Sequence, residues 1–475
     1  MNKNTRKEGL QNVNSTDENE PQIPRRTMLK QGAAVAAAAG FLNSQPAFAQ
    51  QQAPAIATGT QAGRRFRAWV QETDRVVGRA GIEELRLTGL QPRQVLVRTE
   101  ASAPCYTLVQ HGIGGTPASE EWPIVPSQPE ITNHTAVGIV EALGTDVRRV
   151  QLGDRVVIGV VAQCGQCYMC LRGRADHCQF SFAVGGDGFP PPIATRADGT
   201  EIRASIGVGG LSELSVAYEE YLCPVFTDLP AAELSLLGDT AASGFGATIG
   251  MMQIEPGSNV VVLGAGPVGM SAVQGARIAG AAQIIVSEPI AHRREMALQL
   301  GATTVLDTHA EGDNIVESIR ELCKGPTNRL FAGGRGWGKG IGDVDNRGPD
   351  FTIEAVGLTG DRPLAEQPRD PSGIQAMQEA WEFTRRGGEI CYLGWGQPGH
   401  VMYPAKEFAN SGRTVHAGQQ GGLNFMRDMP RLVRLAESGA FDLKTMVTST
   451  WSLDQTPQAF QVVADRTEMA AVVVF

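Results

Sequence analysis

Four cysteines lie close together in the sequence, at Cys164, Cys167, Cys170 and Cys178. Their spacing, C-x2-C-x2-C-x7-C, can fold four thiolates around one tetrahedral cation. Because four protein ligands leave no open coordination position, such a site would hold a structural zinc ion. Two disulfides are the competing interpretation, which an oxidising compartment would permit.

A glycine-rich turn, residues 264–269 with the sequence Gly-Ala-Gly-Pro-Val-Gly, lies between a strand-like run at Val260–Leu263 and a helical pattern. In dinucleotide-binding folds the first glycine permits a tight turn, the second lets the backbone approach the pyrophosphate, and the third allows close helix packing. The N-terminus of the following helix favours phosphate. The predicted cofactor-binding residues of this turn are Gly264, Gly266, Pro267, Val268 and Gly269.

Glu288 ends the next strand-like run, at about the distance where a carboxylate accepts hydrogen bonds from the adenosine ribose. A carboxylate there repels a 2′-phosphate, so the sequence favours NAD over NADP. Two nearby cations, Arg293 and Arg294, would soften that preference if they turned toward the ribose. We include Glu288 and Arg293 among the predicted cofactor-binding residues.

The elements around these residues predict two kinds of domain. From Gln94 to Val161, short β-rich runs separated by Gly, Pro and Asp turns indicate a compact β-barrel-like region. Beyond Glu255, strand-like runs at 259–263 and 283–287 bracket an Ala-rich helical stretch from Val268 to Ala279. This alternation is typical of a parallel α/β sheet, so the predicted fold class is α/β, with a β-rich domain beside a doubly wound domain.

Bulk composition favours a small-molecule substrate. The 475 residues carry a formal net charge of -9 and contain no basic stretch that could neutralise phosphates over an extended surface. A nucleic-acid partner is therefore not expected. The 57 glycines follow no strict repeat, which excludes a collagen-like chain.

The N-terminus resembles a twin-arginine export signal. Residues 24–30, Pro-Arg-Arg-Thr-Met-Leu-Lys, precede an apolar run from Gly32 to Leu42 and then Ala47-Phe48-Ala49. We expect residues 1–49 to be a signal peptide, 50–63 a flexible leader, and the mature protein to be periplasmic. The run is shorter than the roughly 20 residues of a membrane span, so no stable span is expected. A disordered tail with a chance Arg-Arg pair is the alternative.

Export of a folded protein affects whether the four cysteines bind zinc or form disulfides. The twin-arginine machinery carries folded proteins, so a zinc site could close in the reducing cytoplasm before export. Zinc is therefore favoured over two disulfides.

The four-cysteine lobe, the glycine turn, and the segment Gly-Asp-Arg-Val-Val at 153–157 occur in the order seen in zinc-containing medium-chain alcohol dehydrogenases. The resemblance covers nearly everything after residue 64. It implies a GroES-like catalytic domain with a structural zinc lobe at 64–240, a Rossmann domain at 241–419, and a return to the catalytic domain at 420–475. It also implies an alcohol or aldehyde substrate, an active site between the two domains, and a homodimer or homotetramer.

The same resemblance implies a catalytic zinc. The segment Asn133-His134-Thr135 is similar to the family's Gly-His-Glu, whose histidine is a zinc ligand; Cys105 and Asp239 match the other two ligand positions. Thr107 matches the Ser or Thr that bonds the substrate hydroxyl and would relay its proton. The three ligands would leave one coordination position for a substrate oxygen. Each ligand has an ordinary alternative: Cys105 a buried small hydrophobe, His134 a core histidine, and Asp239 a helix cap.

Several side chains that support the zinc ligands or bind the pyrophosphate in the family are replaced in this sequence. Thr135 replaces the carboxylate after the histidine ligand, and Leu108 replaces an aspartate that supports the imidazole. Tyr106 and Ala470 replace arginines that contact the pyrophosphate in some members, so the helix N-terminus must carry more of that binding.

Proton exit and pocket size rest on the resemblance alone. The relay histidine of the family aligns with Gln110, and His111 follows one position later, so either His111 or bulk water would take the proton. Val160 lies where a bulky aromatic often narrows the substrate pocket, and Trp395 lies near the expected nicotinamide end. A roomier, partly aromatic pocket would suit a larger alcohol.

The expected function is hydride transfer between an alcohol or aldehyde and NAD. Because free NAD is not expected outside the cytoplasm, one hypothesis is a cofactor bound before export and then retained. The alternative function is a zinc-stabilised, non-catalytic binding or scaffold protein descended from this fold. The missing carboxylates favour that alternative, and the joint presence of Cys105, His134, Asp239 and Thr107 opposes it.

Overall fold

The computed structural model describes residues 61–72, 80–108, 129–181, 191–325, 330–331, 344–357, 374–394 and 400–475. These residues belong to one compact unit, Ile56–Phe475. The expected signal peptide at 1–49, leader residues 50–60, His111 and Trp395 lie outside the described residues. Within the described ranges, no helix has the length and apolar character needed to cross a membrane.

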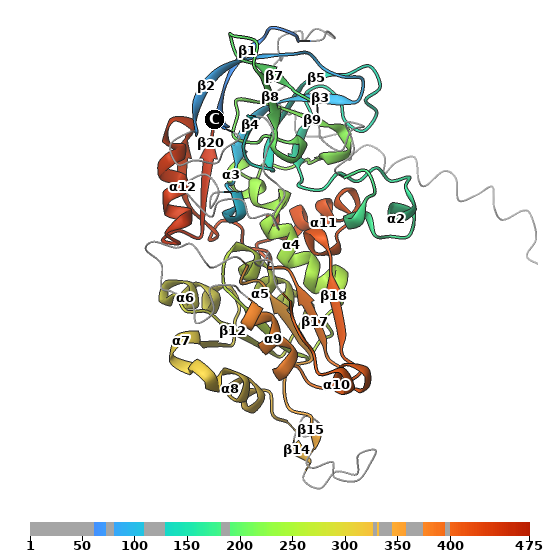
Figure 1. Cartoon of the computed structure of the whole chain (residues 1–475), viewed down its shortest axis with the longest axis vertical. Coiled ribbons are helices and arrows are strands. Elements are labelled where there is room, and N and C mark those ends of the chain that lie inside the picture. Colours follow the sequence, from blue (N-terminus) through green and yellow to red (C-terminus); the bar gives the residue numbers. More distant parts are fainter. Residues whose placement is uncertain are drawn as a thin grey trace, which may run out of the picture. The chain divides into compact units, whose positions relative to one another are not determined.

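The β-rich half, blue to green in Figure 1 apart from its two red strands near the C-terminus, contains a closed barrel and a seven-stranded sheet. The barrel strands are β1 (Arg65–Gln71), β2 (Ala80–Leu87), β7 (Ala194–Thr195), β8 (Glu201–Ala204) and β4 (Glu130–Ile131). The sheet strands are β10 (Leu222–Pro224), β6 (Arg155–Ile158), β5 (Ala136–Leu143), β3 (Gln94–Ser102), β20 (Ala470–Val474) and β19 (Val447–Ser452), with β9 (Leu214–Tyr218) paired to β3. The β-rich prediction for this region is confirmed.

The last strands of the chain return to this sheet. β20 runs antiparallel to β3, with Val473 opposite Ser102, and β19 runs parallel to β20. The buried residues of β20 are alanine and valine, which pack well on a pleated surface covered on both faces. Residues near the C-terminus therefore lie beside the strand that leads to Cys105.

The second half is a six-stranded parallel sheet with the order β13-β12-β11-β16-β17-β18. Its strands are β11 (Asn259–Leu263), β12 (Gln283–Ser287), β13 (Thr304–Leu306), β16 (Phe351–Glu354), β17 (Glu389–Tyr392) and β18 (Thr414–Ala417). In chain order this is the 3-2-1-4-5-6 arrangement of the doubly wound nucleotide-binding fold. The α/β prediction is confirmed, including the strand limits predicted for β11 and β12.

Helices cover this sheet and link it to the β-rich half (Figure 1). Those of the nucleotide-binding half and its approach are α3 (Ala231–Ser235), α4 (Thr240–Gly246), α5 (Pro267–Ala279), α6 (Ala291–Leu300), α7 (Thr308–Glu311), α8 (Ile315–Leu322), α9 (Ile374–Phe383) and α10 (Ala405–Asn410). The later helices are α11 (Phe425–Glu437) and α12 (Thr456–Ala464). A short helix, α2 (Tyr168–Leu171), lies in the four-cysteine lobe.

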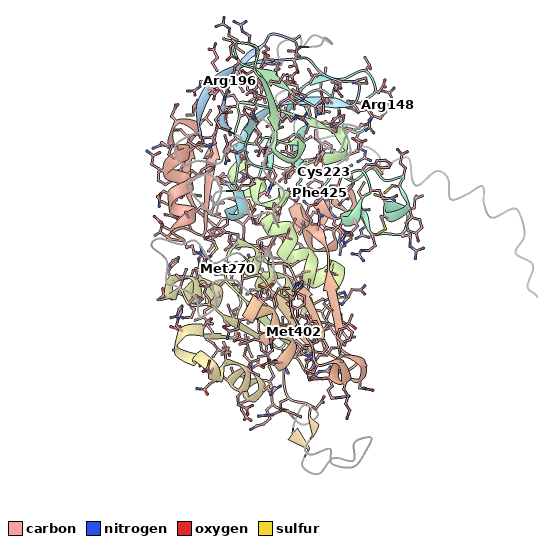
Figure 2. The ribbon with its side chains drawn as sticks, viewed as in Figure 1. Arg148, Arg196, Cys223, Met270, Met402 and Phe425 are labelled. Atoms are coloured by element: carbon pink, nitrogen blue, oxygen red, sulfur yellow. The ribbon has the colours of Figure 1, made fainter. Side chains whose placement is uncertain are left out.

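One hydrophobic cluster joins the two halves. It contains Val157 and Cys223 of the β-rich sheet, Val262 and Met270 of the nucleotide-binding half, and Phe425 of α11. Figure 2 labels Cys223, Met270 and Phe425 within this shared core. Because close-packed interiors transmit displacement, residues at this junction are held in one mutual arrangement.

Candidate active site and metal centres

The four cysteines of the lobe are brought together. Their sulfurs lie within 4.8 Å of one another, and Cys167 and Cys178 are 4.0 Å apart. In a zinc tetrahedron the sulfur–sulfur edge is about 3.8 Å, whereas a disulfide bond is about 2.05 Å. All the described cysteines are free thiols, so the four sulfurs fit a metal ion better than two disulfides.

Backbone groups prepare these sulfurs to carry negative charge. The N–H groups of Gln166 and Cys167 point at the Cys164 sulfur at 3.4 and 3.3 Å. At Cys167, burial is outweighed by backbone hydrogen bonds from Cys170 and Gln179, which lower its thiol pKa to about 6. Burial raises the pKa of Cys170 to about 12, so the four thiols cannot all ionise without a cation. The lobe fits a tetrahedral zinc ion.

A second cluster joins residues that are far apart in the sequence. Ligand atoms of Cys105, His134 and Asp239 lie within 4.8 Å of one another. The His134 Nε2 atom is 3.0 Å from Oδ2 of Asp239, close to the nitrogen–oxygen edge of a zinc site, which is about 3.4 Å. Cys105 follows β3, His134 precedes β5, and Asp239 precedes α4. One thiolate, one imidazole and one carboxylate fit a zinc ion that keeps a position for substrate.

Asn133 holds the first two of these segments together, and the sequence analysis did not identify this role. Its Nδ2 donates to Ser102 Oγ at 2.6 Å and to the Ala103 carbonyl at 2.9 Å. The residue has φ +69, which non-glycine residues adopt rarely and asparagine more readily than most. The signal was present, because Asn133 occupies the glycine position of the family's Gly-His-Glu segment.

Asp239 occupies the N-cap position of α4, yet its side chain makes no capping hydrogen bond there. Its carboxylate faces His134 instead, so the helix-cap alternative does not account for this side chain. The peptide before it is held by Gln420, whose Nε2 donates to the Gly238 carbonyl at 2.6 Å. A Cβ on Gly238 would lie 2.6 Å from the Ile158 carbonyl oxygen, so this approach requires glycine. No sequence motif pointed to Gln420.

The second cluster attracts positive charge. Burial alone would lower the His134 pKa, but the Cys105 and Asp239 groups outweigh it and raise that pKa to about 10. Burial alone would raise the Asp239 pKa, but the hydrogen bond and charge of His134 outweigh it, and that pKa falls below its usual value. The half-buried Asp239 carboxylate and the Cys105 sulfur therefore lie beside a position that favours a cation.

The other imidazole nitrogen of His134 has no partner in the described part of the chain. Its Nδ1 is buried and makes no hydrogen bond to any described residue. Metal-bound histidines usually donate this N–H to a carboxylate or carbonyl oxygen. The family resemblance placed Leu108 where a supporting aspartate is common, and the unpartnered Nδ1 agrees with that replacement.

Thr107 lies beside the cluster. Its hydroxyl is 3.2 Å from the Cys105 sulfur. His111, the other predicted catalytic residue, lies outside the described residues, and its role as a relay stays a prediction.

The glycine turn has the tight turn and the close helix packing predicted for its first and third glycines, and the approach of a pyrophosphate to the second stays a prediction. Gly264 has φ +84, and a Cβ there would lie 2.9 Å from the Ala355 carbonyl oxygen. A Cβ on Gly269 would lie 1.9 Å from the Gly264 carbonyl oxygen, so close packing requires this glycine. Gly266 is the N-cap of α5 and faces open space, apart from one Arg293 nitrogen. Pro267 is at the start of the helix and Val268 is in its first turn.

Glu288 and the two arginines lie around this turn. Glu288 directly follows β12, and its carboxylate accepts the Ala265 N–H at 2.7 Å and the Ile290 N–H at 2.9 Å. Arg294 turns away, toward Asp307 at 2.8 Å. Arg293 points back toward Gly266, with Nη1 3.9 Å from the position of a Cβ there.

The metal cluster and the dinucleotide turn are coupled through two helices. α4 begins directly after Asp239 and packs against α5, which begins at Pro267 after the N-cap residue Gly266. A Cβ on Gly244 of α4 would lie 2.0 Å from the Val268 carbonyl oxygen, so the two helix backbones are in close contact. Asp239, the third ligand of the cluster, is thus fixed relative to the N-terminal end of α5.

Two family models match this chain, one in each half of the structure. The family model described as alcohol dehydrogenase GroES-like domain matches residues 91–227, and the one described as zinc-binding dehydrogenase matches residues 267–362. The chain is 27% identical to the putative alcohol dehydrogenase D of Mycobacterium tuberculosis, over 82% of this chain and 95% of the relative. It is also 27% identical to the NDMA-dependent alcohol dehydrogenase of Amycolatopsis methanolica, over 82% of this chain and 94% of the relative.

Among solved structures, an alcohol dehydrogenase zinc-binding domain protein from Burkholderia ambifaria superposes with a TM-score of 0.71 at 24% identity, over 87% of this chain and 99% of that one. At this identity the likeness shows the fold. Taken with the matches above, the chain is a zinc-dependent oxidoreductase that is similar to alcohol dehydrogenases, and its nucleotide-binding half suits a nicotinamide cofactor. The non-catalytic scaffold alternative is not favoured by these matches.

Proposed function

We propose that this protein is an NAD-dependent alcohol dehydrogenase with one structural and one catalytic zinc ion, the latter held by Cys105, His134 and Asp239. The observation that carries the proposal is the open three-ligand cluster with the Thr107 hydroxyl 3.2 Å from one of its sulfurs. A zinc ion bound there would act as a Lewis acid on the substrate oxygen. Thr107 would accept the proton of the substrate hydroxyl and pass it outward, toward His111 or water.

NAD is preferred to NADP in this proposal because of Glu288. Its carboxylate is buried and fixed by two backbone N–H groups, so it cannot easily turn away from a ribose bound at the end of β12. A fixed negative charge there disfavours a 2′-phosphate. A comparison of Kd for NADH and NADPH, measured by quenching of intrinsic fluorescence, tests this, and tighter NADPH binding would contradict it.

Metal content and alcohol turnover test the whole proposal. Purified protein should contain two zinc ions per chain by elemental mass spectrometry, and should reduce NAD or an added electron acceptor only when an alcohol is present. One zinc per chain without alcohol-dependent turnover would overturn it. If Val160 leaves a larger substrate pocket, aryl or long-chain alcohols should turn over faster than ethanol. Faster turnover of ethanol would contradict the larger pocket.

Export and cofactor retention form a second part of the proposal. The Arg25-Arg26 pair, the apolar run and the Ala47-Phe48-Ala49 site support export by the twin-arginine machinery to the periplasm. Replacing both arginines by lysine should leave the protein in the cytoplasm of a fractionated cell. A cofactor bound before export would be retained and reoxidised by an external acceptor, a scheme in keeping with a relative named for its dependence on NDMA. Heating the mature protein should then release nicotinamide dinucleotide.

The assembly is expected to be a homodimer or homotetramer, by resemblance to the family. Size-exclusion chromatography with light scattering tests this, and a monomer would contradict it.

A further inference from the structure

The N-terminal turn of α5 is open at only one of its three glycines. Side-chain atoms on Gly264 or Gly269 would collide with backbone at 2.9 and 1.9 Å. At Gly266 the only atom of the described residues within 4 Å of a Cβ is Nη1 of Arg293, at 3.9 Å. The backbone at Gly266 therefore faces the Arg293 guanidinium with room for a methyl group between them.

Arg293 is buried, and the described residues give its guanidinium few hydrogen-bond partners. Only 8% of the residue is exposed, and its Nε makes no hydrogen bond to any residue in the described part of the chain. Its Nη2 donates to the Glu468 carbonyl at 3.4 Å, the long end of the hydrogen-bond range. Burial lowers the pKa of Arg293, but a guanidinium remains protonated in proteins. A buried cation in this state favours an anionic ligand.

The nearby acid does not supply that anion by direct contact. Both oxygens of Glu288 accept backbone N–H groups, from Ala265 and Ile290, and among the described ion pairs none joins Glu288 to Arg293. The charges of Glu288 and of the Tyr106 hydroxyl act on Arg293 only at longer range. Arg294, next in α6, is committed to Asp307.

We propose that Arg293 binds the pyrophosphate of the dinucleotide, opposite the N–H groups at the start of α5. The assignment rests on the proposed nicotinamide-dependent function. The guanidinium offers a planar fork of donors suited to phosphate oxygens, and the helix terminus adds its own N–H groups and positive dipole. Arg293 thereby supplies, from α6, a positive charge that positions 106 and 470 do not carry.

The position of Arg293 favours the pyrophosphate over a ribose phosphate. Gly266 is the glycine at which backbone approaches the pyrophosphate, whereas the adenosine ribose belongs at the end of β12, beside Glu288. If Arg293 instead bound a 2′-phosphate, its substitution would weaken the binding of 2′,5′-ADP alone.

The test compares Arg293→Gln with the wild-type chain, both loaded with zinc and freed of nucleotide, by titration calorimetry with ADP, adenosine, 2′,5′-ADP and NADH. Loss of a charge-assisted contact should raise Kd for ADP and NADH about tenfold or more and leave adenosine binding unchanged. Arg293→Lys should recover part of the ADP affinity. Arg294→Gln is the matched control from the same helix and should bind ADP as the wild type does. Circular dichroism and zinc content establish that each variant is folded.

Three results would overturn the assignment alone: unchanged ADP affinity in Arg293→Gln, a loss confined to 2′,5′-ADP, or an equal loss for adenosine. A wild-type chain that binds neither NADH nor ADP would instead overturn the proposed function, and this assignment with it.

Discussion

The two metal clusters differ both in their donor atoms and in the way the chain assembles them. The lobe takes all its ligands from the segment between Cys164 and Cys178, and backbone N–H groups of that same segment support its sulfurs. The Cys105–His134–Asp239 cluster draws on three separate segments, and His134 and Asp239 are 105 residues apart in sequence. A closed site can therefore form locally, whereas the open site depends on the packed junction of both halves.

The open site is also the less completely supported one. Among the described residues, the His134 Nδ1 atom and the buried Thr135 hydroxyl have no hydrogen-bond partner. We expect the lobe to act on stability and the open cluster on the chemistry.

The largest effect is expected for His134→Ala. Removing one of three ligands should abolish binding of the catalytic zinc and lower kcat/KM at least about a thousandfold, equivalent to about 4 kcal/mol of transition-state stabilisation. Zinc content should fall from two to one per chain. The control is Cys223→Ala, a buried cysteine outside both clusters, which should keep both zinc ions. Near-normal turnover by His134→Ala would refute the open site.

Cys178→Ser should act on stability instead. Loss of the lobe zinc should cost several kcal/mol of folding free energy, because metal binding and folding of such a lobe are coupled. Thermal unfolding should shift to lower temperature, and one zinc should remain. At a temperature where the variant is folded, alcohol turnover should largely persist. If turnover disappears while the second zinc is retained, the lobe takes part in the chemistry and the division of roles is wrong.

Thr107→Val should slow proton transfer without loss of metal. Removing the hydroxyl 3.2 Å from the Cys105 sulfur should lower kcat about a hundredfold. Thr107→Ser keeps the hydroxyl and should retain most activity, while both variants should bind two zinc ions. Equal activity of Thr107→Val and Thr107→Ser would contradict a role for the Thr107 hydroxyl in proton transfer.

The smallest effect is expected for Leu108→Asp, which supplies an acceptor for the unpartnered Nδ1–H of His134. A carboxylate partner should strengthen zinc binding at the open site about tenfold. The measurement is zinc loss to a competing chelator, with Leu108→Met as the apolar control. Faster zinc loss from Leu108→Asp than from Leu108→Met would contradict the proposed support.

Much of the architecture could be predicted from local pattern. The strands at Asn259–Leu263 and Gln283–Ser287, the helix that starts at the glycine turn, and the β-rich first half follow from periodicity and turn residues. The cysteine spacing and the glycine fingerprint are equally local, because their ligands or backbone contacts come from neighbouring residues. Local sequence patterns are therefore sufficient to predict the fold class and the grouping of the four cysteines.

The tertiary structure decided how distant residues meet. It brings Cys105, His134 and Asp239 together. Asn133 and Gln420 hold the neighbouring segments by hydrogen bonds. Arg293 points toward Gly266, whereas Arg294 pairs with Asp307. Adjacent arginines on one helix look alike in sequence. Their directions depend on the helix's rotation against the sheet and on the partners that other segments present, so only the packed chain distinguishes them.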